Sequence, residues 1–421
     1  MPDAGTGPAS PTVLVVHCID TEGPLGGDIR RNPDGTAEFM DNWDDIAASL
    51  EELTEPGFRQ THLDSQLNPY TYNWFILDFT GFKTNPKKRI PIYNDTYDQI
   101  KRLNTSMDGF YWHYHVPPAD GAGDQWSDTW LSSNECNRIL AHRLLDRFDF
   151  PAVFRAGGTI EDEPGSQWLE EVFPLDFSNR ISKRSYAGAD LFNFNWYGAP
   201  DEWGSYHPSH DDFTKPGQMR RFIYRCIDLR SRSNDLTSTD VDNCFAAVSE
   251  TGHTAVLSFF SHDVRDMRPE TYDIYDALTA AAENHNVPWL SCTATQAHQL
   301  YHGISPRLTS LDVSVAAGAV RIVTDGSAFQ STPFVAARLV DDRAVRLYPE
   351  SVSATEWLLP LDVSRLRRIG VAVTSESGDK SVYVGDISQL GGAFVLTPCV
   401  ETASGQEAVG REPRPAMRSV R

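Results

Sequence analysis

Short apolar runs alternate with helix-like patterns through most of this chain, and this alternation limits the fold more than any other feature. It extends from about Thr12 to about Gly303. The apolar runs are short and mostly rich in Val, Ile, Phe, Tyr or Trp, which is typical of buried strands: 13–19, 74–79, 109–116, 152–154, 255–260 and 287–290. The helices expected are 43–53, 96–103, 132–148, 218–229, 241–251 and 269–285. Strands that alternate with helices predict a parallel sheet or an α/β barrel.

The pattern changes after Gly303. Residues 308–400 contain short alternating runs separated by turn clusters such as 324–326 and 375–378, which predicts an all-β, sandwich-like domain. We therefore expect four regions: a flexible tail at 1–11, an α/β barrel at 12–303, a β-sandwich-like domain at 307–403 and a disordered basic tail at 404–421. The β domain either binds carbohydrate or packs on the barrel and shapes its cleft.

Composition narrows the class of function. A 421-residue chain with 40% hydrophobic residues can bury a sizeable core, which excludes wholesale disorder. Its net charge of −21 disfavours nucleic acid and anionic membranes as partners. We expect no membrane span, because no apolar run reaches about 18 residues, and no secretion signal at the N-terminus. The six scattered cysteines then predict free thiols in a cytoplasmic protein, whose oligomeric state stays open.

Four of the predicted strands end in side chains that can bind metal or move protons. In α/β barrels the catalytic groups gather at the carboxyl ends of the strands, because the βα loops open there. We therefore expect these groups to meet at one rim of the barrel. They are Asp20 with Glu22, His113 with His115, Arg155, and His262 with Asp263.

The spacing of two residues adds a second constraint. Side chains two apart on a strand share a face, so Asp20 and Glu22 lie together, as do His113 and His115. Two histidines and one carboxylate bind a divalent ion and leave a position open for water, whose pKa falls from 15.7 to roughly 7. The second carboxylate is then free to act as a general base. Taken singly, each of these residues also has a structural explanation; their coincidence favours a site.

Four segments, in this order, resemble the motifs of the polysaccharide deacetylase family (NodB-homology, carbohydrate esterase family 4-like). They are His-Cys-Ile-Asp-Thr-Glu-Gly at 17–23, Trp-His-Tyr-His at 112–115, Phe-Arg-Ala-Gly-Gly at 154–158 and Leu-Ser-Phe-Phe-Ser-His-Asp at 257–263. Residues 287–297 resemble the family's last strand and following helix, so the resemblance covers about 12–302. It implies a distorted (β/α) barrel of the polysaccharide deacetylase type that removes acyl groups from amino sugars with a divalent metal.

The resemblance also implies a role for each residue of the metal site. Asp20 matches the general base that deprotonates the attacking water. Glu22 is shifted by one position from the family's metal-binding acid, so Asp20 and Glu22 could exchange roles. His113 and His115 match the metal histidines, but their spacing is His-x-His where the family has His-x-x-x-His. Either one or both are therefore expected to bind the ion.

Further roles follow from the same resemblance. Arg155 matches the arginine that hydrogen-bonds the catalytic acid, although Ala and Gly replace the family's neighbouring prolines. His262 matches the general acid that protonates the leaving amine. Asp190 matches the acid that orients this histidine, with Asp263 and Asp201 as alternatives.

Aromatic residues near these motifs are candidates for substrate binding, since aromatic faces stack on sugar rings; the alternative is a buried hydrophobic cluster. They are Trp112, Trp196, Tyr197 and Trp203. The expected activity is metal-dependent deacetylation of an N-acetylated sugar or another N-acylated small molecule. The expected ion is Zn²⁺, with Co²⁺, Ni²⁺ and Mn²⁺ as alternatives. Two rival functions are a hydrolase of non-sugar amides on the same scaffold and a catalytically degenerate glycan-binding protein.

Overall fold

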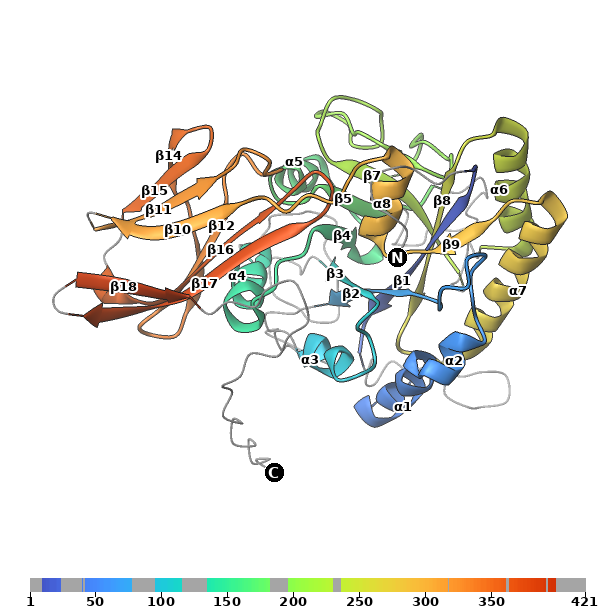
Figure 1. The fold of residues 1–421 in the computed structure, drawn as a ribbon, viewed down its shortest axis with the longest axis horizontal. Helices are drawn as coiled ribbons and strands as arrows, with labels where there is room; N and C mark the ends of the chain where they lie inside the picture. Colours follow the sequence, from blue (N-terminus) through green and yellow to red (C-terminus); the bar gives the residue numbers. More distant parts are fainter. Residues whose placement is uncertain are drawn as a thin grey trace.

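Seven parallel strands close into a barrel in this computed structural model (Figure 1). The structure describes residues 10–23, 40, 42–77, 95–115, 135–181, 196–229, 236–316, 318–360, 363–390 and 393–398. In ring order the barrel strands are β1 (Val13–Thr21), β2 (Tyr72–Leu77), β3 (Gly109–Tyr114), β4 (Val153–Ala156), β5 (Leu175–Asn179), β7 (Phe222–Asp228) and β8 (Ala255–His262), which pairs again with β1. The ring is distorted, because β9 (Trp289–Ser291) pairs with the start of β1 and β6 (Ser205–Tyr206) pairs antiparallel with β7. The structure confirms the predicted class, an α/β barrel followed by an all-β domain.

Helices cover the barrel wall and its amino end. They are α1 (Trp43–Thr54), α2 (Pro56–Gln60), α3 (Asp95–Lys101), α4 (Glu135–Arg147), α5 (Glu163–Val172), α6 (Ser238–Thr251), α7 (Arg268–His285) and α8 (Ala294–His302), with a short 3-10 turn, η1 (Gly157–Thr159), after β4. Residues of α8 belong to the same cluster as the barrel interior, so this helix covers the amino end. Each helix in the described ranges is too short or too polar to cross a lipid bilayer.

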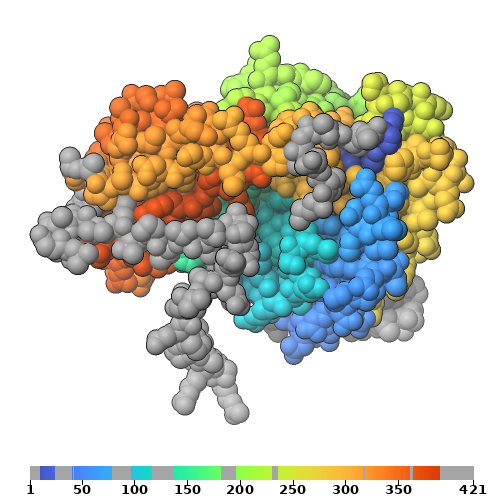
Figure 2. Space-filling model, viewed as in Figure 1, coloured from blue at the N-terminus to red at the C-terminus, as the bar shows by residue number. Residues whose placement is uncertain are grey.

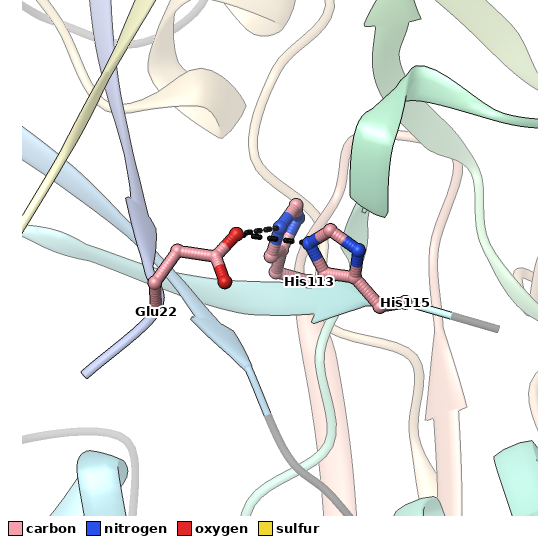
Figure 3. A group of neighbouring side chains, drawn as sticks. All are labelled: Glu22, His113 and His115. Carbon is pink, nitrogen blue, oxygen red and sulfur yellow. Dashed lines mark hydrogen bonds and ion pairs between the residues drawn. The ribbon is translucent and has the colours of Figure 1, made fainter. Parts of the chain in front are cut away.

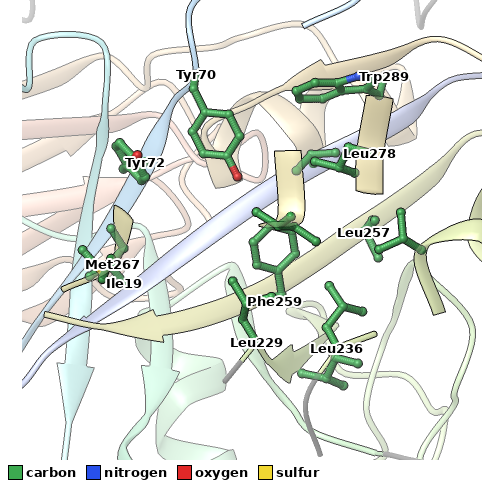
Figure 4. Packing of buried hydrophobic residues seen from close by; sticks show 14 of the residues in the cluster. Ile19, Tyr70, Tyr72, Leu229, Leu236, Leu257, Phe259, Met267, Leu278 and Trp289 are labelled. Carbon is green, nitrogen blue, oxygen red and sulfur yellow. The ribbon is translucent and has the colours of Figure 1, made fainter. Parts of the chain in front are cut away.

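Successive side chains along the barrel strands alternate between the barrel interior and its outer face. Leu14 and Cys18 of β1 face the interior cluster, whereas Val13 and Ile19 face the outer cluster that α1, α6 and α7 cover. Figure 4 shows part of this outer cluster, with side chains from β1, β8 and α7 side by side. Because Asp20 lies two residues beyond Cys18, its side chain continues the inner row to the carboxyl edge of the barrel.

One predicted helix is wrong. Residues 218–229 contain β7, a strand in the middle of the barrel wall. Ile223, Tyr224, Cys226 and Ile227 are all buried, because the wall is covered on both faces. A strand buried on both faces has no polar alternation, so its pattern is hard to separate from that of a buried helix. The strand β5 and the helix α5 have no counterpart among the predicted elements.

The C-terminal domain is a sandwich of two antiparallel sheets. One sheet has the order β10 (Leu311–Ala316), β11 (Ala319–Thr324), β15 (Glu356–Pro360) and β14 (Glu350–Ser353). The other has the order β13 (Ala344–Leu347), β12 (Phe334–Leu339), β16 (Leu366–Thr374), β17 (Lys380–Leu390) and β18 (Ala393–Pro398). Ile322 and Trp357 of the first sheet share a buried cluster with Val335 and Ile369 of the second, so the two sheets enclose one core.

The β domain also shares a core with the barrel. Leu140 and Leu144 of α4 lie in one buried cluster with Phe334 and Ala372 of the second sheet. The approach is close: a Cβ added to Gly370 would lie 2.8 Å from Cγ of Leu144. Figure 2 shows the two parts in contact along a broad front. The β domain therefore packs directly on the barrel wall.

A buried charge cluster joins the barrel and the β domain at this interface. Arg143 Nε donates to Asp149 Oδ2 at 2.9 Å, and Lys380 of β17 pairs with the same carboxylate. Burial opposes the ionisation of Asp149, but Lys380 and Arg143 outweigh it and hold its pKa well below the usual range. A lowered pKa stabilises the fold above the unfolded-state value of about 4, and this contribution is lost as the pH falls.

We expect Asp149→Asn to lower the free energy of unfolding by about 3 kcal/mol at pH 7, because Arg143 would keep a buried charge without its counter-ion. The deficit should shrink as the pH falls below about 4. Urea unfolding of both proteins across this range measures it. The matched control is Asp386→Asn, which breaks the more exposed pair with Arg368 and should change stability by less than about 1 kcal/mol. Equal losses in the two variants would contradict the assignment.

Candidate active site

Glu22, His113 and His115 meet at the carboxyl edge of the barrel. The carboxylate of Glu22, just beyond β1, is directed at both imidazole rings at the end of β3 (Figure 3). Its Oε1 lies 2.9 Å from Nε2 of His115 and 3.7 Å from Nε2 of His113. One potential ligand atom from each residue falls within 4.8 Å of the others, so the group could hold a metal ion.

The environment of His113 suits a metal ligand. Its Nδ1 lies 3.1 Å from the carbonyl oxygen of Arg155, which can only accept a hydrogen bond, so Nδ1 carries the proton. In the neutral form of the ring, Nε2 then presents a lone pair. That nitrogen is buried and makes no hydrogen bond to any described residue. A neutral imidazole whose second nitrogen donates to a carbonyl is the usual arrangement of a metal-binding histidine.

Gly157 leaves the room that His115 needs. A Cβ at this position would lie 2.4 Å from Cγ and Cδ2 of the His115 ring and 2.8 Å from its Cα. The next residue, Gly158, has φ of +60°, a left-handed conformation that glycine adopts without strain. The two glycines after β4 therefore let the chain turn while it touches the ring of His115.

Asp20 and Arg155 form a buried ion pair beside this group. Arg155 Nε donates to both oxygens of Asp20, at 2.8 and 3.0 Å. Both residues are almost fully buried. Burial alone would raise the pKa of Asp20, but the charge of Arg155 and smaller effects of His113 and His262 lower it below its ordinary value. Asp20 is therefore a carboxylate at neutral pH, and its Oδ1 lies 3.7 Å from Nδ1 of His113.

His262 ends β8 on the same side of the barrel wall. It is the direct cross-strand partner of Asp20, so the two side chains share a face. Nδ1 of His262 is buried and has no hydrogen-bond partner within the described ranges. Burial lowers the pKa of His262, and the negative charges of Asp20 and Asp228 oppose this effect.

Asp228 is an acid near His262 that the sequence interpretation missed. It ends β7 and is the cross-strand partner of Phe260, two residues before His262 on the same face. Its carboxylate is buried and accepts a hydrogen bond from Nη2 of Arg180 at 3.0 Å. The signal was an acidic residue at the end of an apolar run, but the run was assigned to a helix. Asp190, the predicted orienting acid, lies outside the described residues.

Most of the aromatic residues predicted to bind substrate do not present a surface at the carboxyl edge of the barrel. Trp112 is wholly buried on the outer face of β3, in the cluster under α4 and α5, so its predicted role is wrong. Trp196 is also wrong as a stacking surface, because it is 1% exposed and its Nε1 donates to the carbonyl of Thr159. Tyr197 is exposed, and its contact with substrate stays a prediction.

Trp203 lies at the opposite end of β8. Its carbonyl accepts the N–H of Val256, six residues before His262, which places it about 20 Å along the strand from the site. Its ring stacks under the guanidinium of Arg225 at 4.0 Å. The predicted contact between Trp203 and a substrate at the carboxyl edge is therefore wrong.

Comparison with known proteins shows little overall similarity. No protein-family model matches this chain, and no curated protein does. A solved structure from Parabacteroides distasonis, described as a "putative glycoside hydrolase/deacetylase", matches with a TM-score of 0.40 and 13% sequence identity, over 92% of this chain and 86% of that one. That similarity is too low to assign a family, and the fold assignment follows from the strand order described above.

The contact between Gly157 and His115 can be tested directly. We expect Gly157→Ala to destabilise the protein by about 1–3 kcal/mol and to displace the ring of His115, because the added methyl group overlaps it. Gly57→Ala in α2 is the matched control, since a Cβ there meets no atom within 4 Å and should be neutral or stabilising by up to about 1 kcal/mol. Urea unfolding measures both. Wild-type stability of Gly157→Ala would show that the contact is not tight.

Proposed function

We propose that this protein is a metal-dependent amide hydrolase that removes an acetyl or other acyl group from an N-acylated amino sugar or glycan intermediate. The observation that supports it most is the position of Glu22, His113 and His115 beside the buried pair of Asp20 and Arg155. A potential metal site and a carboxylate held in its ionised form stand together at the carboxyl edge of an α/β barrel, where catalytic groups of such barrels lie.

The three ligands proposed for the ion are Glu22, His113 and His115. Two imidazoles and one carboxylate form a common catalytic zinc set, so Zn²⁺ is the ion proposed, with Co²⁺, Ni²⁺ and Mn²⁺ as alternatives. When bound, the ion would act as a Lewis acid that lowers the pKa of water and polarises the substrate carbonyl. The proposal gives Glu22 the ligand role and leaves Asp20 as the base.

Asp20 is proposed to take the proton from the attacking water. Its lowered pKa keeps it ionised at neutral pH, and the role of base requires this unprotonated form. Arg155 orients the carboxylate through Nε, while its Nη1 donates to the carbonyl of Phe177 at 2.7 Å and so fixes the guanidinium. A fixed arginine keeps the base in one orientation, which lowers the cost of positioning it for each turnover.

His262 is proposed to deliver a proton to the leaving nitrogen. It stands across from Asp20 on the next strand, so base and acid are neighbours on one face of the wall. Asp228 is proposed to orient this imidazole and favour its charged form, the role that the sequence interpretation gave to Asp190. The effect of Asp228 on the pKa of His262 has the sign that this role requires.

A hydrolase of non-sugar amides is the second candidate. The burial of Trp112 and Trp196 removes two of the aromatic surfaces that favoured a sugar. Nothing in the base, the ligands or the acid is specific to a sugar, because these groups act on the amide alone. A panel of N-acetylated sugars and of linear and cyclic amides distinguishes the two candidates by the product released.

We expect the purified protein, after removal of metal and reconstitution with Zn²⁺ or Co²⁺, to bind one ion per chain. His113→Ala should abolish stoichiometric binding, because the remaining two ligands hold the ion poorly. His253→Ala, a change at an exposed histidine of the same chain, is the control and should bind the ion as the wild type does. Elemental analysis after dialysis measures the content. A wild-type protein that takes up no ion would contradict the proposal and favour a degenerate glycan-binding protein.

We expect His262→Ala to lower kcat for deacylation by about 10²–10⁴-fold, the usual contribution of general acid–base catalysis, while the ion stays bound. Asp20→Asn should lower kcat at least as strongly and also leave the ion in place. Release of acetate from an active substrate measures the rates, with metal content measured on the same samples. If either variant lost the ion together with activity, that residue would be a ligand instead. For Asp20, this result would mean that the roles of Asp20 and Glu22 have to be exchanged.

A further inference from the structure

A main-chain hydrogen bond connects the ends of β1 and β8 beyond their last pair of cross-strand partners. Asp20 and His262 are the last cross-strand partners of this pairing. The N–H of the next residue, Asp263, then donates to the carbonyl of Asp20 at 3.4 Å. The side chain of Asp263 is therefore carried to the point where the chain leaves β1 and enters the segment with Glu22.

The carboxylate of Asp263 is hydrogen-bonded to the main chain of this segment. Its Oδ1 accepts the N–H of Glu22 at 2.7 Å and that of Gly23 at 3.2 Å, and Oδ2 is 3.4 Å from the N–H of Gly23. Asp263 is fully buried. A buried carboxylate is costly unless it is hydrogen-bonded, so these contacts determine where it can lie.

Gly23 allows the main chain to turn towards the carboxylate of Asp263. Its φ of +64° is a left-handed conformation that other residues adopt only with strain. A Cβ at this position would also lie 3.1 Å from the ring of Trp43 in α1. The chain thus turns sharply just after Glu22, with both N–H groups directed at one side chain.

From this geometry, and resting on the function proposed above, we propose that Asp263 is a positioning residue for the metal site. By holding the N–H groups of Glu22 and Gly23, it sets the main-chain path from which the Glu22 carboxylate reaches His113 and His115. The residue before it is His262, the proposed acid. One two-residue segment at the end of β8 therefore places both the proton donor and, through the main chain, a metal ligand.

Asp263 can act on the metal site either by positioning the main chain or by its negative charge, and the two roles need different features of its side chain. Positioning requires a hydrogen-bond acceptor at Oδ1, which asparagine supplies and alanine does not. A long-range attraction for the cation requires the negative charge, which both substitutions remove. Asp263→Asn therefore separates the two roles, because it keeps the shape and one acceptor oxygen of the side chain.

The experiment is a titration of the metal-free full-length protein with Co²⁺, followed by calorimetry and by the visible absorption of the bound ion. We expect Asp263→Ala to weaken Co²⁺ binding by about 10- to 100-fold and to change the absorption spectrum, as the loss of a residue that orients a ligand does. Asp263→Asn should stay within about threefold of the wild type. Asp266→Asn is the matched control: its partly exposed carboxylate accepts from Arg268, and Co²⁺ binding should not change.

If Asp263→Ala does not fold, Asp263→Leu, which keeps the branched shape of the side chain but has no acceptor, replaces it with the same expected loss. Unchanged Co²⁺ affinity and spectrum in the folded alanine or leucine variant would overturn the inference, and so would an asparagine variant as weak as alanine. A wild-type protein that binds no Co²⁺ would instead defeat the proposed function. Crystal structures of the alanine and asparagine variants then still test the positioning: the main chain at Glu22 should move in the first and stay in the second.

Discussion

The ion pair between Arg155 and Asp20 is the interaction on which the rest of the site depends. It crosses the inside of the barrel from β4 to β1 and is almost fully buried. Two charges taken out of water are costly unless further contacts compensate them. Arg155 has such contacts, because it donates to the carbonyl of Phe177 and its guanidinium lies 3.7 Å from the ring centre of Phe260. The pair therefore holds β1, β4, β5 and β8 at one edge.

The same residue also contacts His113, a histidine of the candidate metal site. The carbonyl of Arg155 accepts from Nδ1 of His113, while its side chain fixes Asp20. One residue thereby contacts Nδ1 of His113 through its main chain and orients the carboxylate of Asp20 through its side chain. Such pre-arranged groups need little reorganisation when charge develops during a reaction, and this is the larger part of what a protein contributes to catalysis.

Much of the site could be predicted from the sequence because the strand ends were recognisable. The spacing of two residues placed Glu22 relative to Asp20 and His115 relative to His113, and the structure brings these side chains together. Two of the errors concern barrel strands that are covered on both faces. β7 is buried on both faces and lacks a polar alternation, so it was assigned to a helix and Asp228 at its end was missed. Trp112 was misplaced because sequence alone does not say which face of a covered strand is inside the barrel.

The shared core of barrel and β domain has a consequence for biosynthesis. The apolar face of α4 is covered by strands that come much later in the chain. Arg338, which donates a hydrogen bond to Asp146, follows it by 192 residues, and Arg368, which donates to the carbonyl of Leu145, follows it by 223 residues. At a translation rate of about 5–20 residues per second, the ribosome needs roughly 10 to 45 seconds to add them. During this time the apolar face of α4 that includes Leu140 and Leu144 lacks the strands that cover it in the folded chain.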